Sequence, residues 1–144
     1  MQGLERFGLT GFLQNWAYKK KQLIGICLGM QVLATSGTEG DFRKGLDLLP
    51  GEVVKITDNS VHIGWNSIQF LNHENILNSY EGVDFYFNHS YKFQTKTNSV
   101  SATVNFGEDI PAIVFNGSVV GLQFHPEKSQ ENGLNLLCKL IEGA

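Results

Sequence analysis

The sequence has few cysteines, few charged residues and no long apolar run. Its 144 residues include two cysteines, 17% are charged, and the formal net charge is −3. Two cysteines are too few for the disulfide framework of a small secreted domain. No basic cluster exceeds residues 19–21, which argues against a nucleic-acid ligand. Because no run could span a bilayer and no signal peptide is recognisable, we expect a cytoplasmic protein without a membrane partner.

What is present predicts one globular domain over residues 1–144, with 42% hydrophobic residues. Periodicity and turn residues predict helices and strands along its whole length. The predicted helical segments are 4–21 (interrupted at Gly8 and Gly11), 28 to near 37, one turn within 72–79, and 130–142. The predicted strands are 23–26, 51–56, 61–71, 83–91, 100–106, 112–115 and 119–124, with a surface connection over 38–50 and a hairpin turn at 116–117.

One cysteine lies where a predicted strand turns into a predicted helix. Cys27 has Gly25 and Gly29 two residues away on either side, which is the G-x-C-x-G pattern of a nucleophile elbow. A thiol at a helix N-terminus faces free N–H groups, so we expect its thiolate to be favoured. The alternative is that Cys27 is a small buried apolar residue. We expect this alternative for Cys138, which shares a helical apolar pattern with Leu134 and Ile141.

A histidine follows the last predicted strand. Pro126 favours an extended conformation at His125, so that His125 and Glu127 should project to the same side. A carboxylate beside an imidazole fixes its tautomer and stabilises the imidazolium. Cys27, His125 and Glu127 therefore have the chemistry of a nucleophile, a base and an orienting acid. A zinc site from these three residues is the alternative, but the sequence has no C-x-x-C or H-x-x-x-H spacing.

Four segments together resemble the class I glutamine amidotransferases. They are residues 23–31 (LIGICLGMQ), 62–66 (HIGWN), 85–91 (FYFNHSY) and 121–129 (GLQFHPEKS). The second and third segments, together with Glu127-Lys128-Ser129 of the fourth, narrow the resemblance to the glutaminase subunits of imidazole glycerol phosphate synthase. The resemblance implies an α/β fold, with a flavodoxin-like sheet flanked by helices. It also implies hydrolysis of glutamine without metal or cofactor, and transfer of ammonia to a cyclase partner, a TIM barrel, in histidine biosynthesis.

The resemblance also implies a role for each matching residue. Cys27 corresponds to the nucleophile, His125 to the general base and Glu127 to its orienting partner. The residues that correspond to substrate-binding positions are Leu28 (an oxyanion donor through its N–H), Gln31, His89, Ser90 and Tyr91. The residues that correspond to positions near the partner's docking face are Trp65, Asn66, Tyr86 and Lys128. Packing is the simpler explanation for Trp65 and Tyr86, and a structural hydrogen bond for His62 and His89.

The sequence departs from the family before residue 4. Family members have a strand, a helix, a second strand and a glycine-rich loop with the other oxyanion donor ahead of this point, so we expect N-terminal strands of the fold to be missing. An oxyanion hole without one donor loses about a hundredfold to a thousandfold in rate. We therefore expect weak glutaminase activity from the chain alone. Two other functions fit the same residues: a related glutaminase for amidation of surface sugars, and a catalytically silent module that binds a synthase.

Overall fold

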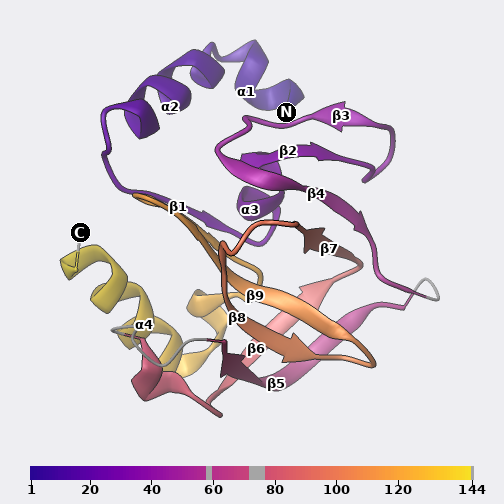
Figure 1. Cartoon of the computed structure of the whole chain (residues 1–144), viewed down its shortest axis with the longest axis vertical. Helices are drawn as coiled ribbons and strands as arrows, with labels where there is room; N and C mark the ends of the chain where they lie inside the picture. The colour runs from indigo at the N-terminus through magenta and orange to yellow at the C-terminus, as the bar shows by residue number, and fades with distance from the viewer. Residues whose placement is uncertain (58–59, 72–76, 144) are drawn as a thin grey trace.

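The structure is a computed structural model that describes residues 1–57, 60–71 and 77–143. Within this part the chain forms two sheets, with helices at the top and at the bottom of the view and one short helix between the sheets (Figure 1). Residues 72–76 of the segment in which we predicted a helical turn lie outside the described residues, and a 3-10 turn, η2 (Asn78–Tyr80), follows them.

The larger sheet has six strands in the order β1-β10-β9-β8-β5-β6. Their bounds are β1 (Leu23–Ile26), β5 (His62–Phe70), β6 (Asp84–His89), β8 (Val100–Asn105), β9 (Asp109–Asn116) and β10 (Val119–Leu122). β1 and β10 are parallel, and the other pairs in this sheet are antiparallel. The predicted turn at Asn116-Gly117 is confirmed, because it joins β9 to β10 with Val119 opposite Asn116. β1 is an edge strand, which leaves one apolar strand edge without a partner among the described residues.

The smaller sheet has four strands in the order β3-β2-β4-β7. They are β2 (Ala34–Gly37), β3 (Arg43–Lys44), β4 (Leu49–Lys55) and β7 (Tyr91–Gln94). Two predictions are wrong here. The helix after Cys27, α3 (Leu28–Leu33), ends before residue 34, and not near residue 37, because the next residues pair with β4. The predicted surface connection 38–50 contains β3 and two fully buried leucines, Leu46 and Leu49. Tertiary pairing therefore overrides the local helical pattern in this segment.

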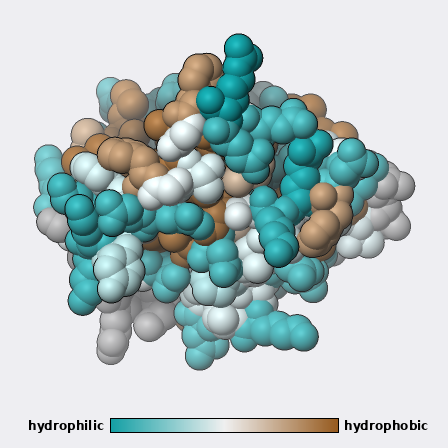
Figure 2. Space-filling model, turned by 90° about the horizontal axis from the view of Figure 1, so that it is seen from above, coloured by the Kyte–Doolittle hydropathy of each residue, from teal (hydrophilic) through white to brown (hydrophobic). Residues whose placement is uncertain are grey.

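Three more helices complete the fold. The predicted interruption of the first helical segment is confirmed at Gly8, a left-handed residue between α1 (Gln2–Arg6) and α2 (Leu9–Tyr18). The predicted interruption at Gly11 is wrong, because Gly11 lies inside α2. The last helix, α4 (Gln130–Glu142), has the predicted bounds. Figure 2 views the molecule from above and shows apolar side chains (brown) among polar ones (teal) on this face. Phe7, at the end of α1, and Phe12 of α2 are both exposed. No helix in the described ranges is long and apolar enough to cross a membrane.

The prediction for Cys138 is wrong, because its side chain is exposed. The buried face of α4 consists of Gly133, Leu136 and Leu140. A methyl group at Gly133 would lie 2.1 Å from the carbonyl oxygen of Pro126, so the absence of a side chain lets α4 approach the preceding turn at this position. This contact sets the rotation of the helix and leaves Leu134, Cys138 and Ile141 on its outer side.

The apolar core has two parts. The first packs against the larger sheet and includes Phe85, Phe87 and Phe124, together with Leu136 from α4. The second lies between the two sheets and includes Met30 and Leu33 from α3, with Leu49 and Val53 from β4. The second core anchors α3, which follows β1, and β10 contributes side chains to both cores. Packing therefore holds the chain in place just beyond the ends of β1 and β10.

Candidate active site

Cys27 lies on a sharp turn between β1 and α3. Its backbone has φ 48° and ψ −105°, a conformation that costs free energy for a residue with a side chain. Two backbone hydrogen bonds hold it: Cys27 N–H donates to Leu122 O at 2.7 Å, and Gln31 N–H donates to Cys27 O at 3.2 Å. The strand, the strained residue and the short helix are the parts of a nucleophile elbow.

The two glycines of the elbow differ in their surroundings. A methyl group at Gly25 would lie 2.6 Å from Leu33 Cδ1 and 2.7 Å from the carbonyl carbon and oxygen of Gly29. A methyl group at Gly29 would meet nothing within 4 Å. Of the two glycines, Gly25 is therefore the one at which the turn leaves no space for a side chain, because the backbone of Gly29 packs against it.

His125 and Glu127 follow the end of β10. His125 has φ −101° and ψ 94°, the extended conformation predicted from Pro126, and the 3-10 turn η3 (Pro126–Lys128) comes next. His125 Nδ1 lies 2.7 Å from Glu127 Oε1. Burial by itself raises the pKa of Glu127, but the hydrogen bonds from His125 and from the Glu127 N–H lower it overall. The carboxylate is therefore ionised and fixes Nδ1 as the protonated ring nitrogen, which leaves Nε2 free to accept a proton.

The main chain of His125 is held as firmly as its ring. Its N–H donates to Tyr86 O at 2.9 Å, and the Ser129 hydroxyl donates to His125 O at 2.7 Å. The same hydroxyl accepts from Tyr86 N–H at 2.9 Å. β6 and the turn after β10 are thus joined through His125, although they are separated in the order of the sheet.

Strand pairing brings the two halves of the site to one edge of the sheet. β1 and β10 are parallel neighbours with Ile26 opposite Leu122, and Cys27 and His125 come one and three residues after these partners. The C-terminal ends of adjacent parallel strands lie at the same sheet edge, where ligands bind in open α/β sheets. The charges of Glu127 and Lys128 both act on the Cys27 thiol.

The Cys27 thiol itself is protonated at neutral pH. Burial raises the pKa of the Cys27 thiol, and this effect exceeds the lowering by a hydrogen bond from Leu28 N–H. The charges of Glu39 and Glu127 raise it further. The expectation of a thiolate stabilised by the helix N-terminus is therefore wrong for the structure as it stands. The thiol packs against the segment that contains Asn88, whose carbonyl oxygen lies 3.8 Å from Sγ. The helix that would stabilise the thiolate, α3, has six residues.

β6 ends at His89 and β7 begins at Tyr91, so that Ser90 alone connects the two strands. Its histidine is buried in a chain of hydrogen bonds: His89 Nδ1–H donates to Tyr91 O at 2.8 Å, and His89 Nε2 lies 3.0 Å from His62 Nδ1. The other ring nitrogen of His62 lies 3.0 Å from Asn66 Nδ2. A carbonyl oxygen only accepts and an amide nitrogen only donates, so the two ends of this series of hydrogen bonds fix which nitrogen of each histidine ring carries the proton. Burial lowers the pKa of His89 to about 4, and both rings are neutral structural imidazoles.

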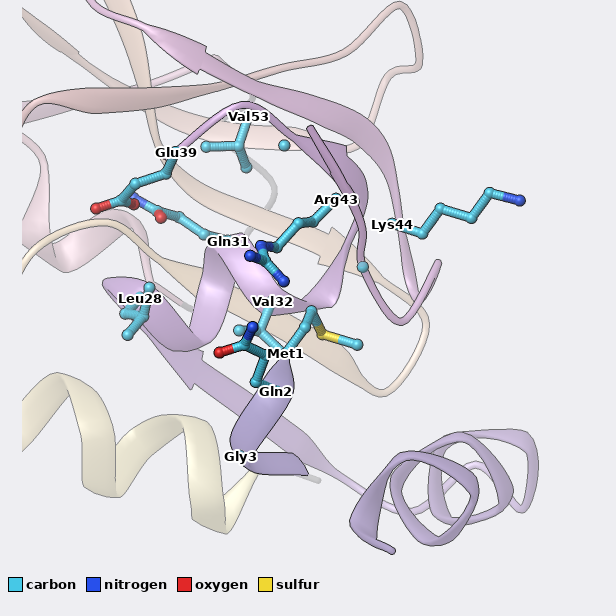
Figure 3. A pocket seen from close by; sticks show the side chains of 12 residues that line it. Met1, Gln2, Gly3, Leu28, Gln31, Val32, Glu39, Arg43, Lys44 and Val53 are labelled. Atoms are coloured by element: carbon cyan, nitrogen blue, oxygen red, sulfur yellow. The ribbon is translucent and has the colours of Figure 1, made fainter. Parts of the chain in front are cut away.

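A pocket of about 340 Å³ opens beside the elbow (Figure 3). It is lined by residues of α3 and of β3, by the start of the chain and by Glu39. Gln31, Glu39 and Arg43 extend toward the same hollow, whereas Lys44 points away from it. The sequence does not predict a site role for Glu39, which lies in the predicted surface connection 38–50. A carboxylate shortly after the elbow helix was the available signal.

The four residues expected near a partner's docking face lie on or beside β5 and β6. Trp65 is opposite Tyr86 in the strand register, their ring centroids are 6.0 Å apart, and Trp65 is 46% exposed. Lys128 Nζ lies 5.8 Å from the centroid of the Tyr86 ring. Asn66 donates to His62, as described above. In the described part of the chain no cluster of three or more His, Cys, Asp or Glu side chains could hold a metal ion.

Comparison with known proteins places these features in a family. The class I glutamine amidotransferase model matches residues 8–140. The chain therefore belongs to the class I glutamine amidotransferase family, and the resemblance predicted from the four sequence segments is confirmed.

Within that family the chain is similar to a particular subunit. It is 42% identical to the imidazole glycerol phosphate synthase subunit HisH of Streptococcus sanguinis over 146 residues, which cover 99% of this chain and 70% of the relative. Its identity to the HisH subunit of Halalkalibacterium halodurans is also 42%, over 95% of this chain and 69% of the relative.

Solved structures confirm the expected fold. A crystal structure of a glutamine amidotransferase matches with a TM-score of 0.73 at 19% identity, over 98% of this chain and 71% of the other. The structure of PurLQS from Thermotoga maritima matches with a TM-score of 0.72 at 17% identity, over 94% of this chain and 68% of the other.

Proposed function

We propose that this chain hydrolyses glutamine to glutamate and ammonia through a thioester on Cys27. The proposal rests on one arrangement: Cys27 and His125 leave the same ends of the adjacent parallel strands β1 and β10, and His125 is bonded to Glu127 at 2.7 Å. A nucleophile, a base and an orienting acid at one sheet edge are what acyl transfer from an amide requires. The family membership supports the same chemistry.

Each residue has a defined part in the proposed reaction. His125 Nε2 takes the thiol proton, and the sulfur forms a bond to the carboxamide carbon of glutamine, whose C=O electrons move to oxygen. Leu28 N–H, which now donates toward the sulfur, is placed to donate to that oxyanion. The imidazolium returns its proton to the amide nitrogen, and ammonia leaves as the C–N bond breaks. Water, deprotonated by His125, then attacks the thioester and releases glutamate and the thiol.

The pocket beside the elbow fits the other end of the substrate. Glutamine carries an α-ammonium and an α-carboxylate, and the hollow between α3 and β3 offers one carboxylate, Glu39, and one guanidinium, Arg43. We assign the ammonium to Glu39 and the carboxylate to Arg43, with Gln31 beside them. Opposite charges at both ends would select an intact amino acid over a simple amide.

The relatives suggest where the ammonia goes. They are subunits of imidazole glycerol phosphate synthase, and we propose that this chain supplies ammonia to the cyclase subunit, a TIM barrel, in the cytoplasm for histidine biosynthesis. Trp65 and Tyr86 offer a paired aromatic surface on β5 and β6 with Lys128 beside it, and aromatic residues are enriched at such interfaces. Co-purification with the cyclase of the histidine pathway tests this assignment, and recovery with an enzyme of surface-sugar amidation instead would contradict it.

Labelling with a diazoketone analogue of glutamine tests the chemistry. The expected result is one label, found on Cys27 by peptide mass spectrometry, absent in Cys27→Ala and reduced by excess glutamine. Cys138→Ala is the matched control, because it removes the exposed thiol and should leave the label in place. A label that stays on the Cys27→Ala chain, or that glutamine does not reduce, would contradict the assignment and favour a silent binding module.

A further inference from the structure

Gln123 is a fully buried amide directed at the nucleophile. It follows β10 directly, its side chain is 0% exposed, and its Nε2 lies 4.0 Å from Cys27 Sγ. Its Oε1 is buried and has no hydrogen-bond partner among the described residues. Burying an amide with half of its hydrogen-bonding capacity unused costs free energy that an apolar residue of the same shape would avoid. The mechanism above uses neither atom.

The sulfur has two kinds of neighbour. Asn88 O accepts from the S–H group at 3.8 Å, and this contact favours the protonated thiol. N–H donors favour the thiolate, and the sulfur has two of them, Leu28 N–H and Gln123 Nε2–H. Leu28 N–H is also the group assigned to the oxyanion, so it cannot serve the sulfur throughout the reaction. Gln123 is the donor that stays with the sulfur.

We propose that Gln123 takes part in catalysis by donating its Nε2–H group to the Cys27 sulfur, which stabilises the thiolate when it attacks and when it leaves. The proposal rests on the proposed role of Cys27 as the nucleophile. The unpartnered Oε1 follows from this role, because one amide cannot direct its nitrogen at the sulfur and also satisfy its oxygen in an apolar core. A 180° rotation about the last side-chain bond would bring Oε1 to the sulfur, where it would accept from the thiol and stabilise the wrong form.

Alkylation of Cys27 by iodoacetamide as a function of pH measures the effect without any need for glutaminase activity. Gln123→Met keeps the shape of the side chain and removes the donor. The expected result is a rise of about one unit in the pKa of Cys27, which is tenfold less thiolate at neutral pH. The alkylation rate should fall only about threefold there, because a more basic thiolate is the better nucleophile. Exposed Cys138, followed by mass spectrometry in the same sample, is the internal reference.

Two controls separate this effect from a general disturbance of the core. Ile113→Leu changes the neighbouring strand β9 at constant volume and should leave the Cys27 profile unchanged. In the unmodified chain, the side-chain amide NMR signal of Gln123 should shift with the midpoint of Cys27 titration, and should lose this shift in Cys27→Ala. The proposal would be overturned if the pH profile of Cys27 alkylation were the same in Gln123→Met as in the unmodified chain. It would also be overturned if the amide signal of Gln123 did not shift as Cys27 titrates. A shifted profile in a chain that hydrolyses no glutamine would uphold the donation from Gln123 to the sulfur and would refute its use in the proposed function.

Discussion

Substitution of the two elbow glycines by alanine should have opposite effects on stability. In Gly25→Ala the new methyl group meets Leu33 Cδ1 at 2.6 Å and the Gly29 carbonyl carbon and oxygen at 2.7 Å. The leucine can rotate away, but the Gly29 carbonyl is part of the main chain of α3. The helix must therefore move, although Met30 and Leu33 anchor it in the second core. In Gly29→Ala the methyl group meets nothing within 4 Å, and alanine favours the helix.

The size of each effect follows from these contacts. Overpacking against a fixed backbone costs about 3 kcal/mol, the upper part of the usual range. The helical preference of alanine over glycine is worth up to about 1 kcal/mol. With a urea m-value of about 2 kcal/mol/M, the unfolding midpoint should fall by about 1.5 M in Gly25→Ala and rise by up to about 0.5 M in Gly29→Ala.

Urea titrations followed by circular dichroism measure both midpoints, and the m-value shows whether the three proteins unfold alike. Gly25→Ala should also lose glutamine hydrolysis more than its stability explains, because Cys27 moves together with α3 and small displacements of a nucleophile cost about a hundredfold. Equal midpoints for the two variants, with equal m-values, would refute the packing argument for the elbow.

Three further predictions concern the site. His125→Ala should abolish glutamine turnover, whereas Glu127→Gln should retain a measurable rate, since the carboxylate orients the base and does not itself transfer a proton. Steady-state ammonia release measures both rates. A lower rate in Glu127→Gln than in His125→Ala would contradict the assigned roles. Glu39→Gln should raise KM for glutamine at least tenfold and change kcat less; an unchanged KM would remove Glu39 from the pocket assignment. The pKa of His89 is about 4 in the folded protein, below its ordinary value of 6.5. Between these two pH values the unfolded chain therefore binds more protons than the folded one. The free energy of unfolding should fall by about 3 kcal/mol as the pH falls from 6.5 to 4. Urea midpoints over this range should be flatter in His89→Gln, and parallel curves would show that another group titrates.

Local sequence patterns were enough to predict the residues of the elbow and the His125–Glu127 pair. In both cases the interacting groups are at most four positions apart, so that chain geometry alone brings them together. The proline after His125 is an example, since it favours the extended φ and ψ that the structure has. The meeting of Cys27 with the turn after β10 depends instead on the parallel pairing of β1 and β10, which the family resemblance implied and no local pattern did.

The features that the sequence did not predict depend on long-range contacts. Residues 34–37 continue a helical pattern, but the pairing of Ser36 with Glu52 and of Gly37 with Val53 makes them a strand. The orientation of α4 follows from the close approach at Gly133, so the face with Cys138 turns outward although its spacing suits a core. Glu39 lines the pocket in the connection between β2 and β3, whose pairing sets Gly37 opposite Arg43.

The protonation of Cys27 bears on the order of events in the proposed reaction. Burial and the charges of Glu39 and Glu127 all raise the pKa of the thiol, so the resting site holds a neutral thiol, while Glu127 holds the Nδ1–H of the His125 imidazole. The ammonium of a bound glutamine at Glu39 would neutralise one of these negative charges and thereby lower the pKa of Cys27. Substrate binding would then produce the nucleophile that consumes the substrate. An empty site would keep its sulfur in the less reactive protonated form, which protects it from oxidation and from stray electrophiles.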